Sequence, residues 1–369
     1  MALDPEEIAR YQRHLSLAGF GVAAQERLKA GSVLVIGAGG LGCPALLYLA
    51  AAGVGRIVIV DPDRVDVSNL QRQVLYGSSD QGAGKAEAAA RRLRALNPLI
   101  RVDPRAVRFD RSNAIDLVRS CDIVVDGSDN FATRYLVNDA CVLANRPFVY
   151  GAIQGFEGHL SVFNWRGGPT YRCLFPEPPE PGTVPNCAEA GVLGAVTGLI
   201  GTAQACEAIK VLAGIGEPLS GRLLIWDTLA MSAHVVGLRR DPDGRPITEL
   251  PPEGYGETCA AAPSRDEIGA EELRRLLASP TPPQLLDVRE DWERALGSIE
   301  PSVHIPLGRL EAGPATDLAP LDPAVPTVVY CAAGWRSLRG IQVLRERHGF
   351  RSAVNLRGGM KGWQALGPR

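Results

Sequence analysis

The feature that most constrains this chain is a glycine-rich turn set between two apolar runs. Residues 33–36 read Val-Leu-Val-Ile, the turn follows as Gly37-Ala-Gly39-Gly40-Leu-Gly42, and residues 43–52 are largely apolar. This order predicts a buried strand, a tight turn at Gly37 and a helix whose first N–H groups face an anion. Gly39 would let the backbone approach a phosphate, and Gly42 would let the helix lie close to the strand. The turn therefore predicts a nucleotide site.

A second strand-like run, residues 56–60, ends in Asp61, 19 residues after Gly42. A carboxylate at this position can accept hydrogen bonds from ribose hydroxyls. With Asp61 in place, a glycine turn that binds no ligand is the weaker interpretation. The turn alone does not distinguish a dinucleotide enzyme from one that uses ATP, and on it alone the dinucleotide interpretation is favoured.

Composition excludes several classes of protein. The 369 residues are 46% hydrophobic and 22% charged, which is typical of a globular protein with two or three domains. A net charge of −2 provides no general basic surface, so nucleic acid is not expected as the main partner. The acidic start predicts no signal peptide, and the longest apolar stretch, residues 191–206, predicts a buried helix and no membrane span. Eight cysteines without paired spacing favour reduced thiols in the cytoplasm.

Apolar runs alternate with helical patterns along residues 1–240, which predicts an α/β domain with a mostly parallel, Rossmann-like sheet. The pattern predicts one helix over residues 5–29 and further helices over residues 43–52, around Lys85, from Phe131 and up to Leu212. Strands are expected at residues 33–36, 56–60, 101–102, 123–126, 147–150, 159–163 and 222–226. Residues 241–264 are rich in proline and glycine and indicate a linker, and residues 265–369 indicate a second, small α/β domain.

Three cations favour ATP over a dinucleotide. Arg13, Arg72 and Lys85 lie on separate segments, and attack on a phosphoryl group needs developing negative charge neutralised from several directions. Each cation alone would more often be a solvated surface charge. Asp129 follows the strand at residues 123–126, so it should meet Asp61 and the glycine turn at the carboxyl ends of the strands, where ligands bind.

These motifs resemble the ubiquitin-activating-enzyme superfamily, and within it the bacterial enzymes that adenylate ubiquitin-like sulfur carrier proteins in molybdopterin and thiamine synthesis. The resemblance covers nearly all of residues 8–240, in order. The matching stretches are Arg10-Tyr-Gln-Arg13-His14, Gly37-Ala-Gly-Gly-Leu-Gly42, Asp61-Pro-Asp63, Ser68-Asn-Leu-Gln-Arg72-Gln73, Lys85, Ser128-Asp129-Asn130 and Cys187-Ala-Glu-Ala-Gly191.

The resemblance implies a homodimer that binds Mg²⁺-ATP at each glycine turn, with Arg13 reaching the phosphates of the neighbouring subunit. It implies that Asp61 holds the ribose and that Asp129 serves the metal and the reacting centre. The implied nucleotide-binding set also contains Gly37, Gly39, Gly40, Gly42, Asp63, Asn69, Arg72, Gln73, Lys85 and Asn130. In the implied reaction the carrier's C-terminal glycine carboxylate attacks the α-phosphorus, releases pyrophosphate and becomes an acyl-adenylate, a mixed anhydride with a good leaving group.

Cys187 follows a proline-rich stretch and precedes a helix-forming run. That setting gives a thiol the exposure and the helix N-terminus that lower its pKa, whereas a lone cysteine is usually an inert small hydrophobe. The position matches a cysteine that some family members use for a covalent link with the carrier or for a disulfide. We expect it to take part in catalysis.

Many relatives also bind a structural zinc through two Cys-x-x-Cys pairs. Here the two segments read Thr170-Tyr-Arg-Cys173 and Gly244-Arg-Pro-Ile247. One thiol cannot make a site that needs four soft ligands, so we expect a protein without zinc and with Cys173 as a buried remnant.

In the C-terminal part, Cys331 ends the strand at residues 327–330 and precedes a glycine-containing turn and a helix predicted from Ser337. The N–H groups of such a turn, with the helix dipole, stabilise a thiolate or a persulfide. A core cysteine at a strand end is the alternative, but it fits poorly with Gly334 and Arg336. We therefore expect Cys331 to be a nucleophile.

This part resembles a rhodanese module. The supporting stretches are Leu285-Leu-Asp287-Val-Arg289-Glu290, His304-Ile-Pro306, Cys331-Ala-Ala-Gly-Trp-Arg336 and Leu356-Arg-Gly-Gly-Met-Lys-Gly-Trp363. Asp287 and Arg289 should organise the sheet beneath the loop, and His304 should pack.

Together the two domains predict adenylation of a sulfur carrier protein ending in Gly-Gly, followed by sulfur transfer from a Cys331 persulfide. Either the persulfide attacks the adenylate directly, or Cys187 takes the acyl group first. A cysteine desulfurase or thiosulfate would supply the sulfur. Two other enzymes stay open: a nicotinamide-dependent oxidoreductase with a sulfur-binding module, and one that passes the carrier to a target lysine. A silent scaffold would require losses among the site residues, and none is lost.

Overall fold

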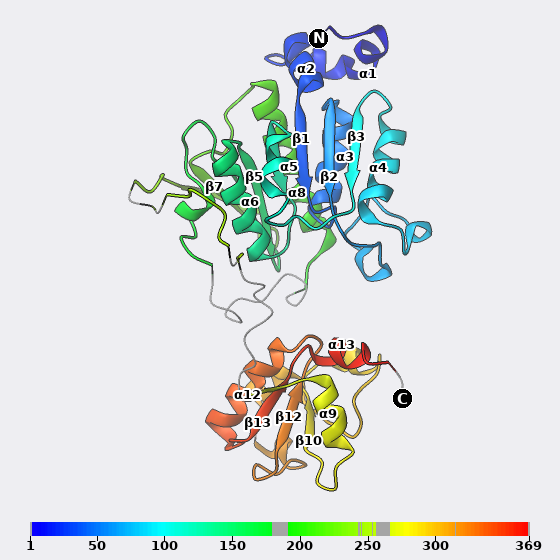
Figure 1. The fold of residues 1–369 in the computed structure, drawn as a ribbon, viewed down its shortest axis with the longest axis vertical. Coiled ribbons are helices and arrows are strands. Elements are labelled where there is room, and N and C mark those ends of the chain that lie inside the picture. Colours follow the sequence, from blue (N-terminus) through cyan, green and yellow to red (C-terminus); the bar gives the residue numbers. More distant parts are fainter. Residues whose placement is uncertain are drawn as a thin grey trace. The chain divides into compact units, whose positions relative to one another are not determined.

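The structure is a computed structural model, and it describes residues 2–178, 191–242, 244, 246–252, 254–255, 266–313 and 315–367. The chain divides into two compact units, with the division near residue 257 (Figure 1). Each unit has its own sheet and its own hydrophobic core.

The first unit contains an eight-stranded sheet. In spatial order the strands are β3 (Arg101–Arg105), β2 (Arg56–Val60), β1 (Ser32–Ile36), β4 (Ile123–Asp126), β5 (Phe148–Gln154), β6 (Glu157–Phe163), β7 (Arg222–Asp227) and β8 (Ser232–Gly237). The first five are parallel and the last three run antiparallel. The expected Rossmann-like architecture is therefore confirmed. The sequence did not predict β8, because its side chains are mostly exposed and carry no buried pattern.

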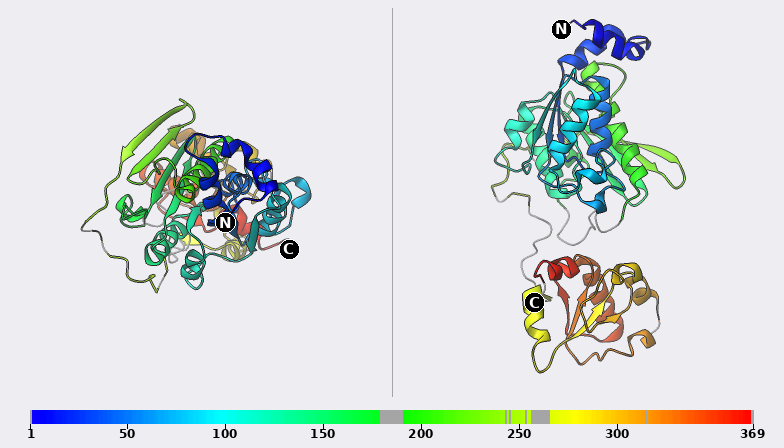
Figure 2. Two further views of the ribbon diagram at one scale, coloured as in Figure 1. Left: turned by 90° about the horizontal axis from the view of Figure 1, so that it is seen from above. Right: turned by 90° about the vertical axis from the view of Figure 1, so that its right-hand side faces the viewer.

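Helices cover both faces of this sheet (Figure 2, right). The helices of this unit are α1 (Pro5–Leu15), α2 (Gly21–Ala30), α3 (Gly42–Ala52), α4 (Lys85–Leu96), α5 (Ala114–Arg119), α6 (Phe131–Ala144) and α8 (Gly194–Ala213). Helices α3, α4 and α8 pack on one face and α5 and α6 on the other, so β1 and β2 are buried on both sides. This double cover explains why those strands read as continuous apolar runs. Short 3-10 turns lie at Val67–Asn69, Ser78–Asp80 and Tyr171–Cys173.

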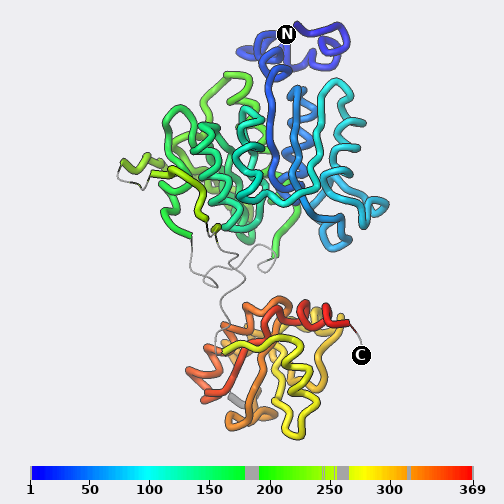
Figure 3. The backbone as a smooth tube through the Cα atoms, viewed as in Figure 1, coloured from blue at the N-terminus to red at the C-terminus, as the bar shows by residue number. Residues whose placement is uncertain are grey.

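The single helix predicted over residues 5–29 is wrong, because α1 and α2 are separate helices. Asp4 caps α1 by accepting a hydrogen bond from the Glu7 N–H at 2.9 Å. After α1 the backbone turns through Gly19, whose φ of +80° lies in the left-handed region that ends a helix. Helix α2 then runs directly into β1 (Figure 3), so both N-terminal helices lie at the amino edge of the sheet.

Part of the expected linker packs on the first unit. Leu250 is only 4% exposed and belongs to the core formed by β4, β5 and α6. The Tyr255 hydroxyl donates a hydrogen bond of 2.6 Å to the Asp139 carboxylate. The segment that joins the two units is therefore anchored as far as Tyr255.

Helix α8 is long and apolar enough to cross a membrane, judged by length and composition alone. A core helix passes the same test, and α8 contacts α3, β4, β5 and β6. Ile200 and Ala205 are fully buried on it. Its packing inside the first unit accounts for its apolar composition.

The second unit has a five-stranded parallel sheet. In spatial order its strands are β11 (Val303–His304), β10 (Gln284–Asp287), β12 (Thr327–Tyr330), β13 (Ala353–Leu356) and β9 (Glu267–Ile268). Its helices are α9 (Ala270–Leu277), α10 (Asp291–Arg294), α11 (Leu307–Ala312), α12 (Trp335–His348) and α13 (Gly359–Gln364), with a 3-10 turn at Ala315–Leu318. Helices α11 and α12 lie against one face and α9 and α13 against the other. Helix α12 begins two residues earlier than predicted.

Candidate functional site

The glycine turn has the local geometry that the sequence predicts. Gly37 has a φ of +87°, and a Cβ there would lie 2.8 Å from the Gly127 carbonyl oxygen. A Cβ at Gly42 would overlap the Gly37 carbonyl oxygen, so only glycine lets α3 start this close to β1. A Cβ at Gly39 would meet nothing nearer than Gln73 at 3.7 Å, which leaves the backbone open to the cavity in front of it.

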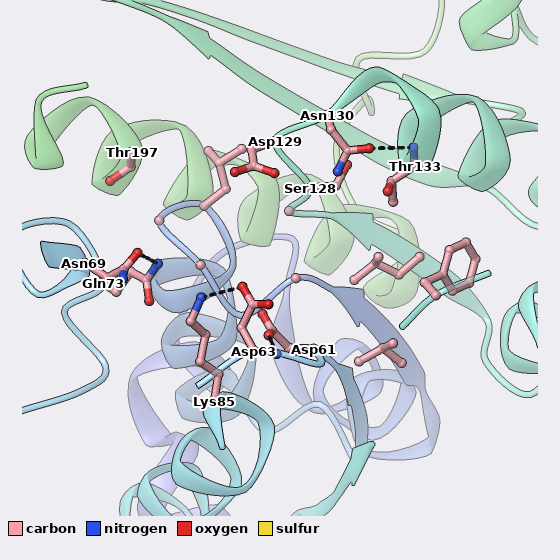
Figure 4. A pocket seen from close by; sticks show the side chains of 18 of the residues that line it. Asp61, Asp63, Asn69, Gln73, Lys85, Ser128, Asp129, Asn130, Thr133 and Thr197 are labelled. Atoms are coloured by element: carbon pink, nitrogen blue, oxygen red, sulfur yellow. Dashed lines mark hydrogen bonds and ion pairs between the residues drawn. The ribbon is translucent and has the colours of Figure 1, made fainter. Parts of the chain in front are cut away.

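That cavity measures about 420 Å³ and lies at the carboxyl ends of β1, β2 and β4 (Figure 4). This size is ordinary for a small-ligand site. Of the nucleotide-binding residues that the sequence predicts, all but Gly42 line it. Gly42 lies just behind the turn, where its role is to let helix and strand approach.

Asp61 holds the glycine turn in place. One carboxylate oxygen accepts a hydrogen bond from the Ala38 N–H at 2.7 Å, and the other accepts from the Asp63 N–H at 2.8 Å. Burial raises the pKa of Asp61, although these two N–H groups act in the opposite direction. Each oxygen keeps a further lone pair, so the carboxylate can accept from a ligand hydroxyl as well.

Donor groups form one wall of the cavity. The buried Lys85 ammonium lies 2.9 Å from the exposed Asp63 carboxylate. The Asn69 side-chain oxygen accepts from Arg72 and from Gln73, both at 3.1 Å, and so orients two side chains at once. Figure 4 shows the contact with Gln73. The side-chain oxygen of Gln73 is buried and has no hydrogen-bond partner among the described residues. An ammonium, a guanidinium and the backbone N–H groups of the turn together suit a phosphate chain.

Asp129 and Asn130 follow β4 and behave differently. Asp129 is exposed to the cavity. The Asn130 side-chain oxygen accepts from the Thr133 N–H at 2.9 Å, so Asn130 is the N-cap of α6. The fully buried Asp126 carboxylate accepts from the Ser128 N–H at 3.0 Å and fixes the turn that presents Asp129. Burial raises the pKa of Asp126.

Several residues that line the cavity were not predicted, among them Phe109 and Arg134. Phe109 lies in the loop after β3, and only the strand order brings that loop beside β2. Arg134 lies four residues after Asn130, one helical turn further along α6, which is a signal that the sequence did contain. Its guanidinium lies 5.6 Å from the centre of the Phe131 ring and 5.7 Å from that of Tyr150.

Arg13 does not line the cavity of its own chain. It is exposed on α1. Tyr11 of the same helix packs against Gly53, which lies just before β2. Helix α1 is therefore at the amino edge of the sheet, whereas the cavity is at the carboxyl edge.

The cysteine positions of the first unit give two outcomes. Cys187 lies outside the described residues. The expected burial of Cys173 is wrong: it is partly exposed, and its sulfur accepts from the backbone N–H groups of Thr170 and Asp241, both at 3.4 Å. It lies at the end of a 3-10 turn near the surface, outside the core. Within the described ranges, no group of three or more His, Cys, Asp or Glu side chains could hold a metal ion.

In the second unit, Cys331 follows β12 and is fully buried. Its sulfur accepts from the Gly334 N–H at 3.1 Å and from the Ser337 hydroxyl at 3.5 Å. Arg336 makes a two-point ion pair with Glu293 at 2.7 and 2.6 Å, which fixes the end of the cysteine loop. The loop thus places donors on the sulfur, as a thiolate or persulfide requires.

The acidic and basic residues predicted beneath this loop are paired. The buried Arg289 guanidinium lies 2.7 Å from Asp287 and also donates to the carbonyl of Gly297. His304 contacts the Arg289 carbonyl at 2.7 Å and is half-buried, which agrees with a packing role.

The fold and these two sites define a nucleotide-binding α/β protein that carries a second unit with a cysteine loop. Residues 11–245 match the ThiF family, and residues 269–366 match the rhodanese-like domain. The chain belongs to the ThiF family. Both resemblances inferred from the motifs are confirmed.

Three curated relatives illustrate the similarity. The probable adenylyltransferase/sulfurtransferase MoeZ of Mycobacterium tuberculosis is 47% identical over 98% of this chain and 94% of its own. The adenylyltransferase and sulfurtransferase MOCS3 of Sus scrofa is 42% identical over 99% of this chain and 87% of its own. A sulfur carrier protein adenylyltransferase of Thermus thermophilus is 54% identical over 64% of this chain and 89% of its own.

Among solved structures, a crystal structure of E. coli MccB with ATP superimposes with a TM-score of 0.56. It is 25% identical and covers 64% of this chain and 73% of its own.

Proposed function

We propose that this protein adenylates the C-terminal glycine of a ubiquitin-like sulfur carrier protein and then transfers sulfur to it from a Cys331 persulfide. The observation that carries the proposal is the presence, in one chain, of a cation-lined cavity at a glycine turn and of a cysteine loop with donors on its sulfur. Relatives that align over 98% and 99% of this chain and are named adenylyltransferase and sulfurtransferase support it.

The nucleotide is ATP, in keeping with ThiF-family membership. Asn69, Arg72 and Lys85 would hold the phosphates together with the N–H groups of the turn, and Asp61 would hold the ribose. The apolar side of the cavity, which includes Ile36, Val60 and Phe109, suits the purine ring. The buried, unpartnered oxygen of Gln73 supports a ligand in contact with this wall.

Mg²⁺ fits the cavity because Asp129 presents a carboxylate to it, and Mg²⁺ in such sites is bound by one or two carboxylates and by substrate phosphates. When bound, the ion would neutralise charge that develops on the phosphates. We further propose that the protein holds no structural zinc, since Cys173 is the one thiol of the two segments that bind zinc in relatives. One zinc ion per chain by elemental analysis would contradict this.

In the first step the carrier's carboxylate oxygen attacks the α-phosphorus and pyrophosphate leaves. Arg72 and Lys85 would stabilise the negative charge on the phosphates, and Asp129 would orient the reacting centre. The acyl-adenylate that forms carries AMP as its leaving group.

In the second step the terminal sulfur of the Cys331 persulfide attacks the acyl carbon, AMP leaves, and the carrier is joined to Cys331 through a disulfide. A second thiol then attacks the Cys331 sulfur, which releases the carrier thiocarboxylate and forms a new disulfide. Cys187 is our candidate for this thiol, or for an earlier acyl acceptor. A cysteine desulfurase or thiosulfate would reload Cys331, and a thiol reductant would reopen the disulfide.

We infer a homodimer, because Arg13 is at the opposite edge of the sheet from its own cavity and a phosphate-contacting role requires a second chain. We assign residues 1–240 to the adenylation domain, 241–264 to the linker and 265–369 to the sulfurtransferase domain. Free thiols at the described cysteines support a cytoplasmic location.

The test is carrier-dependent ATP–pyrophosphate exchange, followed by mass measurement of the carrier. A carrier ending in Gly-Gly should support exchange and then gain about 16 mass units, because one oxygen is replaced by sulfur. The same carrier without its last glycine is the control and should support neither. Reduction of a bound nicotinamide, or carrier joined to lysine side chains of other proteins, would contradict the proposal in favour of another enzyme class.

A further inference from the structure

An ionic cluster is centred on the buried Asp139 of α6, and none of its members lines the nucleotide cavity. The Asp139 side chain is about 2% exposed. Its two oxygens accept four hydrogen bonds, from Arg172 at 2.9 and 2.8 Å, from Tyr255 at 2.6 Å and from Asn138 at 2.8 Å. A carboxylate with four donors holds each of them firmly, because losing one would leave polar atoms unsatisfied in a buried place.

The cluster fixes the chain just after the 3-10 turn at Tyr171–Cys173. Arg172 donates to the Pro176 carbonyl at 3.0 Å, and its guanidinium lies 4.9 Å from the centre of the Tyr135 ring. The Tyr135 hydroxyl contacts the Glu177 carbonyl at 2.6 Å. Tyr135 precedes Asp139 by one turn of α6, so both hold the same stretch of chain from one helix face.

The cluster also fixes the chain just before the second unit. Tyr255 gives its hydroxyl to Asp139, and its ring stacks on Tyr135 with centres 6.5 Å apart. Burial raises the pKa of Tyr255, so the hydroxyl keeps its proton and remains a donor at neutral pH. Leu250 is buried in the same core five residues earlier.

The two fixed stretches lead to the two cysteines of the proposed reaction. Cys187 follows Glu177 by ten residues, and the first described residue of the second unit, Asp266, follows Tyr255 by eleven. One side chain, Asp139, therefore supports the starting points of both connections.

We propose that Asp139 is a positioning residue for sulfur transfer: it anchors both the segment that leads to Cys187 and the segment that leads to the Cys331 unit. The inference rests on the proposed function. Anchoring at Tyr255 shortens the connection to the second unit. If Leu250 became the last fixed residue, the connection to Asp266 would grow from eleven to sixteen residues. The effective concentration of the Cys331 unit at the adenylate would then fall roughly twofold.

Amide hydrogen exchange on the full chain tests the anchor directly. Tyr255→Phe removes one hydroxyl and should speed exchange in peptides covering residues 246–255 alone. Asp139→Asn removes the shared charge and should speed exchange in those peptides and in residues 171–178. Tyr48→Phe, at an exposed tyrosine of α3, is the matched control and should change neither. Unchanged exchange at residues 246–255 in Tyr255→Phe, or an effect of Asp139→Asn on one segment alone, would overturn the anchor.

A second readout separates positioning from a merely structural role. Tyr255→Phe should keep the carrier-dependent pyrophosphate exchange of the wild type while forming thiocarboxylate roughly twofold more slowly in a single turnover. Faster amide exchange with wild-type sulfur transfer would overturn the positioning role. Absence of pyrophosphate exchange in the wild type would instead contradict the proposed function, and the amide-exchange result would still decide whether Asp139 is the shared anchor.

Discussion

Single glycines decide how closely α3 lies on β1. We predict that Gly42→Ala lowers the free energy of unfolding by about 1–3 kcal/mol and abolishes ATP binding, because the added Cβ overlaps the Gly37 carbonyl oxygen. Gly198→Ala is the control, since a Cβ there meets nothing within 4 Å and alanine favours a helix interior. Urea unfolding and ATP titration measure both effects. Equal stability of the two variants would contradict the prediction.

The Glu293–Arg336 pair should make the second unit less stable in acid. Burial acts to raise the pKa of Glu293, but the Arg336 guanidinium and the Glu290 N–H outweigh it and hold the pKa below its ordinary value of 4.5. A lowered folded-state pKa stabilises above the unfolded value, and the stabilisation is lost as pH falls through the folded value. Glu293→Gln should therefore unfold more easily than the wild type at pH 7, with the difference shrinking below pH 4.5.

The measurement is urea unfolding of both proteins across that pH range. Glu311→Gln, which breaks the exposed pair with Arg339, is the control and should change stability little at any pH. If the difference in free energy of unfolding between the wild type and Glu293→Gln grew as pH falls, the stabilising role of the Glu293–Arg336 pair would be contradicted.

At this scale, local spacing was enough to find Gly37, Asp61 and Lys85, because each follows a strand or begins a helix in a fixed pattern. It was not enough for Phe109, whose place in the cavity depends on the pairing of β3 with β2. Nor could spacing show that Asn130 caps α6, since a binding residue and a cap have the same sequence signature.

Among the elements, α13 contacts the cysteine loop through its backbone. Met360 donates its N–H to the Cys331 carbonyl at 2.8 Å, and a Cβ at Gly359 would overlap that same oxygen. We predict that Gly359→Ala displaces the loop and reduces sulfur transfer at least tenfold, as expected when about 1.4 kcal/mol of positioning is lost, while carrier-dependent pyrophosphate exchange stays at the wild-type level.

Gly308→Ala, in α11 of the same unit, is the control because a Cβ there meets nothing within 4 Å. Thiocarboxylate formation and pyrophosphate exchange are measured for both variants. Wild-type sulfur transfer by Gly359→Ala would show that the contact between α13 and the loop does not matter.

The strands and helices that are buried could be predicted closely, since β2 and β4 have the bounds that their apolar runs suggest. The break between α1 and α2 was missed although Gly19, between the two helices, and Gly21, at the start of α2, both have positive φ, because apolar residues continue across the break. Strand β8 was missed because its side chains are exposed and its pairing with β7 is the main evidence for it.

At the scale of the whole molecule, Arg13 and Asp129 should act from different chains. Neither Arg13→Ala nor Asp129→Ala should support pyrophosphate exchange alone. Mixed and allowed to exchange subunits, they should recover roughly a quarter of the wild-type activity, because half of the dimers are mixed and each has one intact site. Subunit mixing followed by the exchange assay is the measurement. No recovery, with mixed dimers detected, would contradict the role of Arg13.

The two-unit organisation follows from the change in composition after residue 240, but the anchoring of residues 246–255 does not. Proline and glycine indicate a linker, and the contact of Tyr255 with Asp139 joins residues 116 positions apart. A long-range ionic contact of this kind leaves no local signal in the sequence.

In the proposed function, the first unit makes an adenylate and Cys331 delivers sulfur to it. The most direct measurement compares pyrophosphate exchange and thiocarboxylate formation in Cys331→Ala, with Cys206→Ala, at an exposed cysteine of α8, as the control. We predict that Cys331→Ala keeps full carrier-dependent pyrophosphate exchange and forms no thiocarboxylate. Cys206→Ala should keep both activities. Thiocarboxylate formation by Cys331→Ala, or loss of pyrophosphate exchange in this variant, would contradict the proposed function.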